Sequence, residues 1–261
     1  MGERMCLILF SHENHPVYRL VLAANRDEFF ERPTGEMAFW ESSPDVLAGR
    51  DLKCGGTWMG ITRQGRLAAL TNYRDPASAI NGAPTRGGLV SDFLVGTDSP
   101  RSYLERIDAN AWQYNGFNLI VGDRTRLYHY SNRKGDIEPL GSGVFGLSNH
   151  LLNTPWPKVE KGRRRLSRVL EGGKAPDPDS IFRLLADSSR PGDRSLPDTG
   201  VGLEWERALS PLFISTEAYG TRSSTVVLWR RNGRIDVWER SFKPVKAQPP
   251  LATTLHFRFS V

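Results

Sequence analysis

Short apolar runs separated by turn-forming residues fill the first part of the chain, and they predict β-strands. Residues 6–10 and 18–24 are apolar and rich in side chains that favour strands, and the polar residues 11–16 between them predict a hairpin. Further strands are expected at residues 55–61 and 67–73. The sequence RQGR, residues 63–66, predicts a hairpin turn between them.

The period of the apolar residues then changes. Residues 89–95 carry apolar side chains at helical spacing, and Ser99 followed by Pro100 is typical of the start of a second helix, which we expect to end near residue 107. After it, residues 117–121, 126–130 and 143–147 predict three strands of a meander. The pattern therefore moves from strands to helices and back to strands.

The last part of the chain repeats that change. Helices are expected at residues 156–170 and 179–186, followed by a surface loop at residues 191–202, which are rich in Gly, Pro and Asp. Asn232-Gly233 is a strong signal for a tight hairpin turn. The strands expected in this region are residues 223–229, 235–239 and 253–259.

Strands and helices come in groups and do not alternate one to one. This order disfavours a doubly wound parallel sheet and favours mostly antiparallel sheets with helices packed outside them, which is an α+β fold. No internal repeat or low-complexity tract is present in the sequence. We expect one domain spanning residues 1–261.

The composition fits a folded protein with a large core. Apolar residues make up 39% of the chain, including 12 Phe, 7 Trp and 7 Tyr. The formal net charge of +6 comes largely from Arg, which is spread along the chain. A mild basic excess favours anionic ligands or surfaces without identifying one, and we expect no nucleic-acid partner.

Cysteine and membrane signals point to the cytosol. The chain has 2 Cys, Cys6 and Cys54, too few for a disulfide framework in a protein of this length. No apolar run approaches the ~20 residues that a membrane-spanning helix needs. The apolar residues 5–10 are followed at once by polar ones, so they do not form a secretory signal. We expect a cytoplasmic protein without a transmembrane segment.

Several polar residues stand where predicted strands begin or end. These candidate site residues are Cys6, Arg26, Asp27, Asn72, Asn149 and Arg222. Strand ends of a sandwich can converge on one rim, so we expect the six side chains to form one pocket. Each also has a structural interpretation: a small buried thiol, an ion pair between Arg26 and Asp27, and asparagines in turns.

Together these groups would suit a cysteine nucleophile. A nearby guanidinium such as Arg26 or Arg222 lowers the pKa of a thiol. The carboxylate of Asp27 could orient an amine or accept its proton. The side-chain amide of an asparagine such as Asn72 can donate to a developing oxyanion. If Cys6 were the first residue, its own α-amine, with a pKa near ~8, could act as the general base.

Short motifs in a fixed order extend over nearly the whole chain. Besides Cys6, they are AANRDE at residues 23–28, GGTW at 55–58, LTNY at 70–73, YNGFN at 114–118, GLSN at 146–149, TPW at 154–156 and GTR at 220–222. With these motifs the sequence resembles the NRDE family, which includes transport and Golgi organisation protein 2.

That family is in turn similar to the choloylglycine hydrolase and penicillin V acylase group of N-terminal-nucleophile amidases. The resemblance implies an αββα four-layer sandwich with mostly antiparallel sheets. It also implies a site made of a cysteine, an arginine and an aspartate soon after it, two asparagines and a late arginine. In this chain the six candidate residues fall at comparable places.

The start of the chain departs from the amidase pattern, because residues 1–5 (MGERM) precede Cys6. Either translation begins at Met5, or a peptide is removed, or Cys6 has no free amine. A misassigned start codon is our hypothesis, and the intact mass of the native protein tests it.

Metal binding is not expected from the five His, which lack close ligand spacing, so we expect no metal site and no resident cofactor. Haem remains a candidate as a transported ligand, with His12, His15 and Cys6 as the axial ligands on offer. A basic run from Lys158 to Arg168 lies on a predicted helix. It is either a solvated face or a weak docking site for an acidic partner, a phospholipid headgroup or a phosphorylated ligand.

Two functions follow from these expectations. The first is a cysteine-dependent hydrolase of amide or acyl bonds, with either a C–N or a thioester bond as the target and a small acyl substrate as the partner. The second is a binding or trafficking protein for haem or for acyl-CoA and lipid, without turnover. The resemblance links the second function to secretion and Golgi organisation in eukaryotic relatives.

Overall fold

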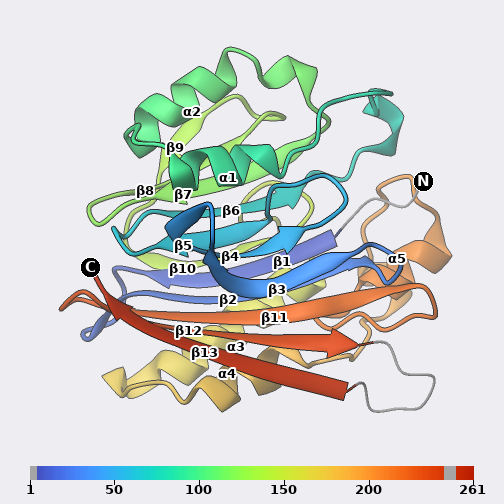
Figure 1. Cartoon of the computed structure of the whole chain (residues 1–261). Coiled ribbons are helices and arrows are strands. Elements are labelled where there is room, and N and C mark those ends of the chain that lie inside the picture. Colours follow the sequence, from blue (N-terminus) through green and yellow to red (C-terminus); the bar gives the residue numbers. More distant parts are fainter. Residues whose placement is uncertain (1–4, 244–250) are drawn as a thin grey trace. The chain divides into compact units, whose positions relative to one another are not determined.

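Two compact units make up the chain in this computed structural model, which describes residues 5–243 and 251–261. The first unit holds residues 5–31, 142–148 and 152–260, apart from the stretch that is not described. The second unit holds residues 32–141, 149–151 and 261. Each unit contains one antiparallel sheet with helices on it (Figure 1).

The first unit is built on a six-stranded sheet with the order β10-β1-β2-β11-β12-β13. Its strands are β1 (Met5–His12), β2 (Tyr18–Phe29), β10 (Gly143–Leu147), β11 (Tyr219–Arg230), β12 (Arg234–Lys243) and β13 (Leu251–Ser260). All neighbouring pairs are antiparallel. β11 and β12 are joined by the expected turn, where Gly233 has the positive φ of 90° that glycine adopts without strain.

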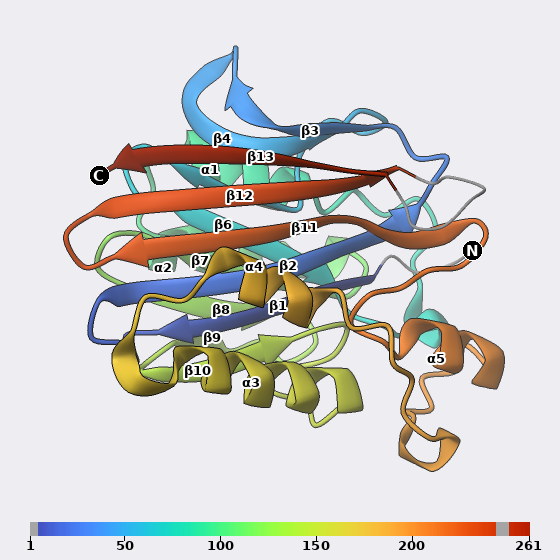
Figure 2. The same ribbon diagram turned by 90° about the horizontal axis from the view of Figure 1, so that it is seen from below.

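Helices cover one face of this sheet. α3 (Pro157–Leu170) and α4 (Pro178–Leu185) pack against β1, β2, β10 and β11 (Figure 2). Their apolar sides meet alternate strand residues such as Leu7, Leu9 and Ala23, which share a face because strand side chains alternate. A further short helix, α5 (Leu203–Leu209), precedes β11 and was not expected from the sequence.

The second unit is built on a seven-stranded sheet with the order β3-β4-β5-β6-β7-β8-β9. Its strands are β3 (Thr34–Trp40), β4 (Ser43–Asp51), β5 (Met59–Thr62), β6 (Leu67–Asn72), β7 (Phe117–Gly122), β8 (Leu127–Ser131) and β9 (Ile137–Pro139). Two helices, α1 (Gly88–Val95) and α2 (Pro100–Asp108), pack on one face and close an apolar core. The Oγ of Ser99 caps α2 by accepting from Ser102 N, as the sequence predicts.

The α+β class and the two antiparallel sheets are confirmed. Each unit supplies one sheet and one helical layer, which is the content that an αββα fold requires. One strand assignment was wrong: residues 143–147 form a strand, but it pairs with β1 and is not part of the meander. The meander is completed by β9 instead. The short apolar run of β10 carries no information about which strand it will pair with.

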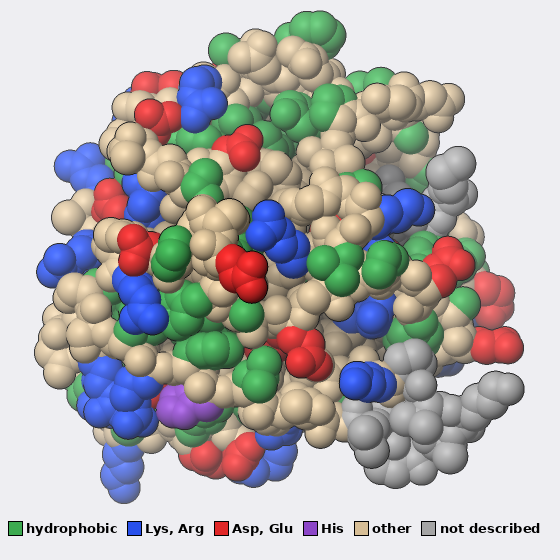
Figure 3. All heavy atoms as spheres, viewed as in Figure 1, with side chains coloured by type: hydrophobic (Ala, Val, Ile, Leu, Met, Phe, Trp, Pro, Cys, Tyr) green, Lys and Arg blue, Asp and Glu red, His purple; other side chains and the backbone are tan. Residues whose placement is uncertain are grey.

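Charged side chains of both signs lie on the face of the molecule seen in Figure 3. Basic and acidic side chains are interspersed over this face, without one large basic field. Within the described part of the chain, no helix is long and apolar enough to cross a membrane.

Candidate functional site

Three neighbouring strands bring most of the predicted site residues to one end of the first unit's sheet. Cys6 on β1 lies opposite Arg26 on β2, and Arg26 in turn lies opposite Ser223 on β11. Directly opposite residues of an antiparallel pair project from the same face of the sheet. Cys6, Arg26 and Ser223 therefore form one row across three strands.

The polar segment after residue 24 is part of the core. We expected the strand to end at residue 24, but β2 continues to Phe29, and Asn25, Arg26, Asp27 and Glu28 are all buried. Polar composition misled the prediction because each side chain finds partners inside the protein. Asn25 is an example: its Nδ2 donates to Leu185 O at 3.0 Å and to Leu212 O at 2.8 Å.

Arg26 forms its ion pair with Glu28. The Nη2 of Arg26 lies 3.6 Å from Oε2 of Glu28, and the two side chains are only 6% and 4% exposed. Residues two apart in a strand share a face, whereas Arg26 and Asp27 project from opposite faces. Arg26 therefore does form an ion pair, but with Glu28 and not with the predicted Asp27. Glu28 was missed as a site residue, although the AANRDE motif contains it.

Arg222 sits in a β-bulge. Thr221 pairs with Asp27 and Ser223 pairs with Arg26, so Arg222 is an extra residue between two consecutive residues of β2. Its Nη1 donates to Phe29 O at 3.0 Å and to Phe30 O at 3.2 Å. Burial lowers the pKa of Arg222, and the positive charge of Arg26 lowers it further. The bulge therefore brings a second arginine to the same end of the sheet as Arg26, and bulges are common near functional sites.

Asp27 projects towards the helical face of the sheet. Thr221 Oγ1 donates to its Oδ1 at 2.6 Å, while Ile214 N donates to that hydroxyl at 3.0 Å. The other carboxylate oxygen, Oδ2, is buried and has no hydrogen-bond partner among the residues that the structure describes. Burial raises the pKa of Asp27 to about 6, although the charges of Lys158 and Arg26 and the Thr221 hydrogen bond oppose the rise. Such an oxygen is available to a group that can donate a hydrogen bond.

Lys158 belongs to this site and not to the surface. The sequence placed it in the basic run on a helix, but it is buried, and its Nζ donates to Leu209 O at 3.0 Å. In the same run, Lys161 and Arg165 form ion pairs with Asp187, and Arg163 Nε donates to Val144 O at 3.1 Å. Anionic-surface binding by the remainder of the run stays a prediction.

The thiol of Cys6 is protonated at neutral pH in this chain. Burial raises its pKa to about 12, and the negative charge of Asp27 adds to the rise. The charge of Arg26 and a hydrogen bond from the backbone of Asp27 act in the opposite direction. Cys6 as a whole is only partly buried, yet enough protein surrounds its sulfur for desolvation to dominate. Arg26 therefore lowers the pKa of the thiol as expected, but burial raises that pKa by more.

Asn72 and Asn149 meet in the second unit. Asn72 is the last residue of β6, and Asn149 lies in the short segment of residues 149–151. Asn149 Nδ2 donates to the backbone oxygen of Asn72 at 3.0 Å, and Arg74 N donates to Asn149 O at 2.7 Å. The structure thus gathers the six predicted residues in two sets, four in the first unit and these two in the second.

Of the two histidines offered for haem, His15 has both ring nitrogens engaged. His15 Nδ1 accepts from Val17 N and Tyr18 N in the turn after β1, and its Nε2 lies 3.2 Å from Lys174 O, beyond α3. His12 is buried. Among residues 5–243 and 251–261, no group of three or more His, Cys, Asp or Glu side chains is placed to hold a metal ion. Cys54 is exposed and accepts from Arg32 Nη2 at 3.3 Å.

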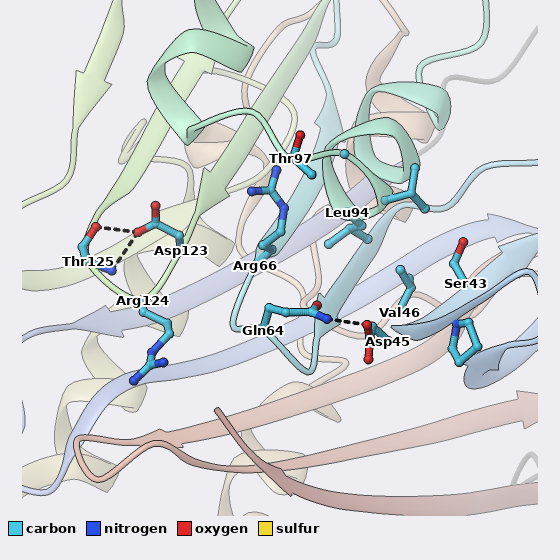
Figure 4. Close-up of a pocket in the computed structure, with 13 residues that line it drawn as sticks. Ser43, Asp45, Val46, Gln64, Arg66, Leu94, Thr97, Asp123, Arg124 and Thr125 are labelled. Carbon is cyan, nitrogen blue, oxygen red and sulfur yellow. Dashed lines mark hydrogen bonds between the residues drawn. The ribbon is translucent and has the colours of Figure 1, made fainter.

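A separate pocket of about 630 Å³ lies in the second unit between the β5–β6 turn and the end of α1 (Figure 4). Its polar groups bind one another or the backbone: Gln64 donates to Asp45, and Arg66 donates to Phe93 O and Asp98 O. The guanidinium of Arg66 also stacks on the Phe93 ring. The pocket contains none of the predicted site residues.

Replacing Asp27 with Asn tests the environment of this carboxyl group through stability. The folded-state pKa of about 6 lies above the usual 3.8, so the unfolded chain ionises first as the pH rises. Asp27 therefore lowers the free energy of unfolding by about 3 kcal/mol between roughly pH 4 and pH 6, with little change outside that range. Urea unfolding of the wild type and Asp27→Asn across this range measures the difference. A constant difference at every pH would contradict the assignment.

A cysteine, two arginines and a half-satisfied carboxylate at the end of adjacent strands define a candidate cysteine-centred site in an α+β protein. A sequence model of the family described as Transport and Golgi organisation 2 matches residues 5–244. The Bos taurus protein "Transport and Golgi organization protein 2 homolog" is 40% identical over 258 residues, which cover 91% of this chain and 93% of that protein. The Homo sapiens homolog is 37% identical with the same coverage. The chain belongs to the Transport and Golgi organisation 2 family, and the resemblance seen in the sequence is confirmed.

Among solved structures, the N-acylethanolamine-hydrolyzing acid amidase ortholog of Caenorhabditis elegans is similar to 85% of this chain and 92% of its own length. The TM-score is 0.49 and the sequence identity is 11%. A likeness at this level supports no statement about the activity of this protein.

Proposed function

We propose that this protein is a cysteine-dependent hydrolase of amide or acyl bonds, either C–N or thioester, with Cys6 as the nucleophile. The observation that carries the proposal is the placement of Cys6, Arg26, Asp27 and Arg222 at one end of β1, β2 and β11. Two guanidinium groups favour a thiolate and a developing oxyanion, and a cytosolic location would keep the thiol reduced.

The reaction has two halves. The sulfur of Cys6 attacks the carbonyl carbon, its proton passes to the leaving nitrogen or sulfur, and the C–N or C–S bond breaks to leave an acyl-enzyme. Water then hydrolyses the new thioester and returns the proton to Cys6. As roles in this scheme, Arg26 and Arg222 stabilise negative charge. The resemblance seen in the sequence assigns the oxyanion to the side-chain amides of Asn72 and Asn149.

The proton acceptor is the remaining requirement, because the thiol is protonated at neutral pH. The α-amine of Cys6 would serve if the mature chain began there. Met5 pairs with Asp27 and Cys6 with Arg26, so the backbone nitrogen of Cys6 lies beside β2 between these two pairs. The unpartnered oxygen of Asp27 is then the natural acceptor for a hydrogen of that amine.

The raised pKa of Cys6 favours a second candidate for a chain that retains residues 1–5. In that form the protein would bind a ligand without turnover, such as acyl-CoA, a lipid or haem. The relatives are named for transport and Golgi organisation, and a comparable role for this chain is part of this alternative. Haem binding through His15 is disfavoured because both of its ring nitrogens are engaged.

Two probes of Cys6 separate the candidates. Iodoacetamide alkylates sulfur without forming an oxyanion, whereas p-nitrophenyl acetate forms one during acylation. For a hydrolase, Asn72→Ala is expected to slow acylation by about 10²–10³-fold and to leave alkylation unchanged. Mass spectrometry of the modified protein and release of nitrophenolate measure the two rates.

Cys6→Ala is the control that removes both reactions at this site, and the intact mass of the native protein shows whether residues 1–5 are present. If Asn72→Ala is acylated as fast as the wild type, and is also alkylated as fast, the proposal of a hydrolase is contradicted. Stoichiometric binding of acyl-CoA that depends on Arg26, without acylation of Cys6, would support the carrier.

A further inference from the structure

The YNGFN motif at residues 114–118 takes no part in the site described so far. Its last residue, Asn118 on β7, is fully buried in the second unit. We propose that Asn118, oriented by His129, is a positioning residue that locks the segment carrying Asn149 to the end of the strand carrying Asn72. This inference rests on the proposed function, because it gives those asparagines their purpose.

Both hydrogens of the Asn118 amide are used. Nδ2 donates to Thr71 Oγ1 at 3.1 Å and to His150 O at 3.0 Å. Thr71 precedes Asn72 on β6, and His150 follows Asn149. One side chain therefore holds the immediate neighbours of both asparagines. Because a backbone carbonyl can only accept, the nitrogen and not the oxygen of Asn118 must face His150.

His129 fixes the direction of that amide. Its Nε2 lies 3.3 Å from Asn118 Oδ1, and an amide oxygen can only accept, so Nε2 must carry the hydrogen. Burial lowers the pKa of His129 to about 4, with a smaller contribution from the charge of Lys134, so the ring is neutral at pH 7. The structure therefore demands one tautomer, in which Nδ1 is without a proton. Nδ1 has no hydrogen-bond partner among the described residues and lies 3.7 Å from Glu138 Oε2.

Other contacts complete the attachment of residues 149–151 to β6. The Tyr73 hydroxyl lies 2.7 Å from His150 Nε2, and the two rings contact each other at a tilt of 36° with centroids 4.8 Å apart. The hydrogen bonds of Asn149 to Asn72 O and of Arg74 N to Asn149 O lie on the same stretch. Asn118 differs from these groups because it reaches the segment from β7, the next strand of the sheet. It therefore fixes the segment against two strands at once.

Positioning of this kind matters for an oxyanion donor, since a misplacement of about 1 Å can cost roughly 10²-fold in rate. A purely structural asparagine would instead change all reactions of Cys6 alike, or none. The ratio of acylation to alkylation of Cys6 separates these cases, because only acylation develops an oxyanion.

The test compares Asn118→Asp with Asn132→Asp in the full chain. Asn132 is a matched control, since it binds backbone groups of the same unit through Phe117 N and Ala111 O and touches neither site asparagine in the described contacts. We expect Asn118→Asp to slow acylation by p-nitrophenyl acetate about 10–100-fold and to change alkylation by iodoacetamide less than about twofold. Asn132→Asp should leave the ratio unchanged.

Equal loss of both reactions in Asn118→Asp, or no loss in a folded variant, overturns the inference. If that variant does not fold, nitrogen NMR of the wild-type imidazoles decides: the tautomer protonated at Nε2 of His129 supports the network, and protonation at Nδ1 overturns it. If Asn72→Ala does not slow acylation, the proposed function is contradicted. If acylation is slowed in Asn72→Ala but proceeds at the wild-type rate in Asn118→Asp, this inference is wrong and the proposed function stands.

Discussion

A chain that begins at Cys6 is expected to be acylated by p-nitrophenyl acetate about 10²–10⁴-fold faster than the full-length chain at neutral pH. In the full-length chain the thiol has a pKa of about 12 and keeps its proton. A free α-amine supplies a base with a pKa near ~8 within reach of the thiol. The unpartnered Oδ2 of Asp27 can hold that amine in place.

The matched control is a chain with a single glycine before Cys6, which keeps the charge of the terminus but moves the amine away from the sulfur. Asp27→Asn in the chain that begins at Cys6 should lose part of the gain. Similar acylation rates for the chain starting at Cys6 and the glycine control would show that the amine plays no part.

Arg26→Met is expected to cost about 3–5 kcal/mol of unfolding free energy, because it removes the cation that is paired with the buried carboxylate of Glu28. Only 4% of the Glu28 side chain is exposed, so water cannot replace the guanidinium. Urea unfolding at neutral pH measures the loss. The double variant Arg26→Met with Glu28→Gln should lose less than the two single variants added together.

Arg101→Met is the control for this experiment. Arg101 forms an ion pair with Glu105 on α2, but the two side chains are 62% and 53% exposed. Its loss should cost no more than about 0.5 kcal/mol. An Arg26→Met variant as stable as Arg101→Met would mean that the buried pair contributes nothing, and the account of the AANRDE segment would have to change.

The sequence predicted the family and most of the elements, because apolar period and turn residues are local signals. The hairpin at Asn232-Gly233 and the Ser99 cap are examples, since each depends on a few adjacent residues. The strand partner of β10 depends on residues far away in the chain, and its sequence gives no indication of them. α5 was missed because the Gly- and Pro-rich loop before it masks a helix of only seven residues.

For the site, the sequence predicted the residues more accurately than it predicted the partners of their side chains. It paired Arg26 with Asp27 as neighbours, whereas strand alternation sends them to opposite faces and leaves Glu28 as the partner of Arg26. It placed Lys158 among exposed cations, because a single buried lysine in a basic helix looks like the others. The roles of Thr221 and Asn118 depend on hydrogen bonds between strands. The sequence shows the motifs that contain these two residues but not their hydrogen-bond partners.

The extra residue at Arg222 has a consequence for how this protein can vary. The side chains of β11 before and after the bulge project from the same faces as their partners on β2, because Arg222 is left out of the pairing between the two strands. Deleting Arg222 would restore regular pairing, with Thr221 still opposite Asp27, but would remove the bulge and the guanidinium that it carries. The extra residue is therefore what places an arginine at this end of the sheet, and relatives that keep this arginine should also keep three residues between Gly220 and Ser224.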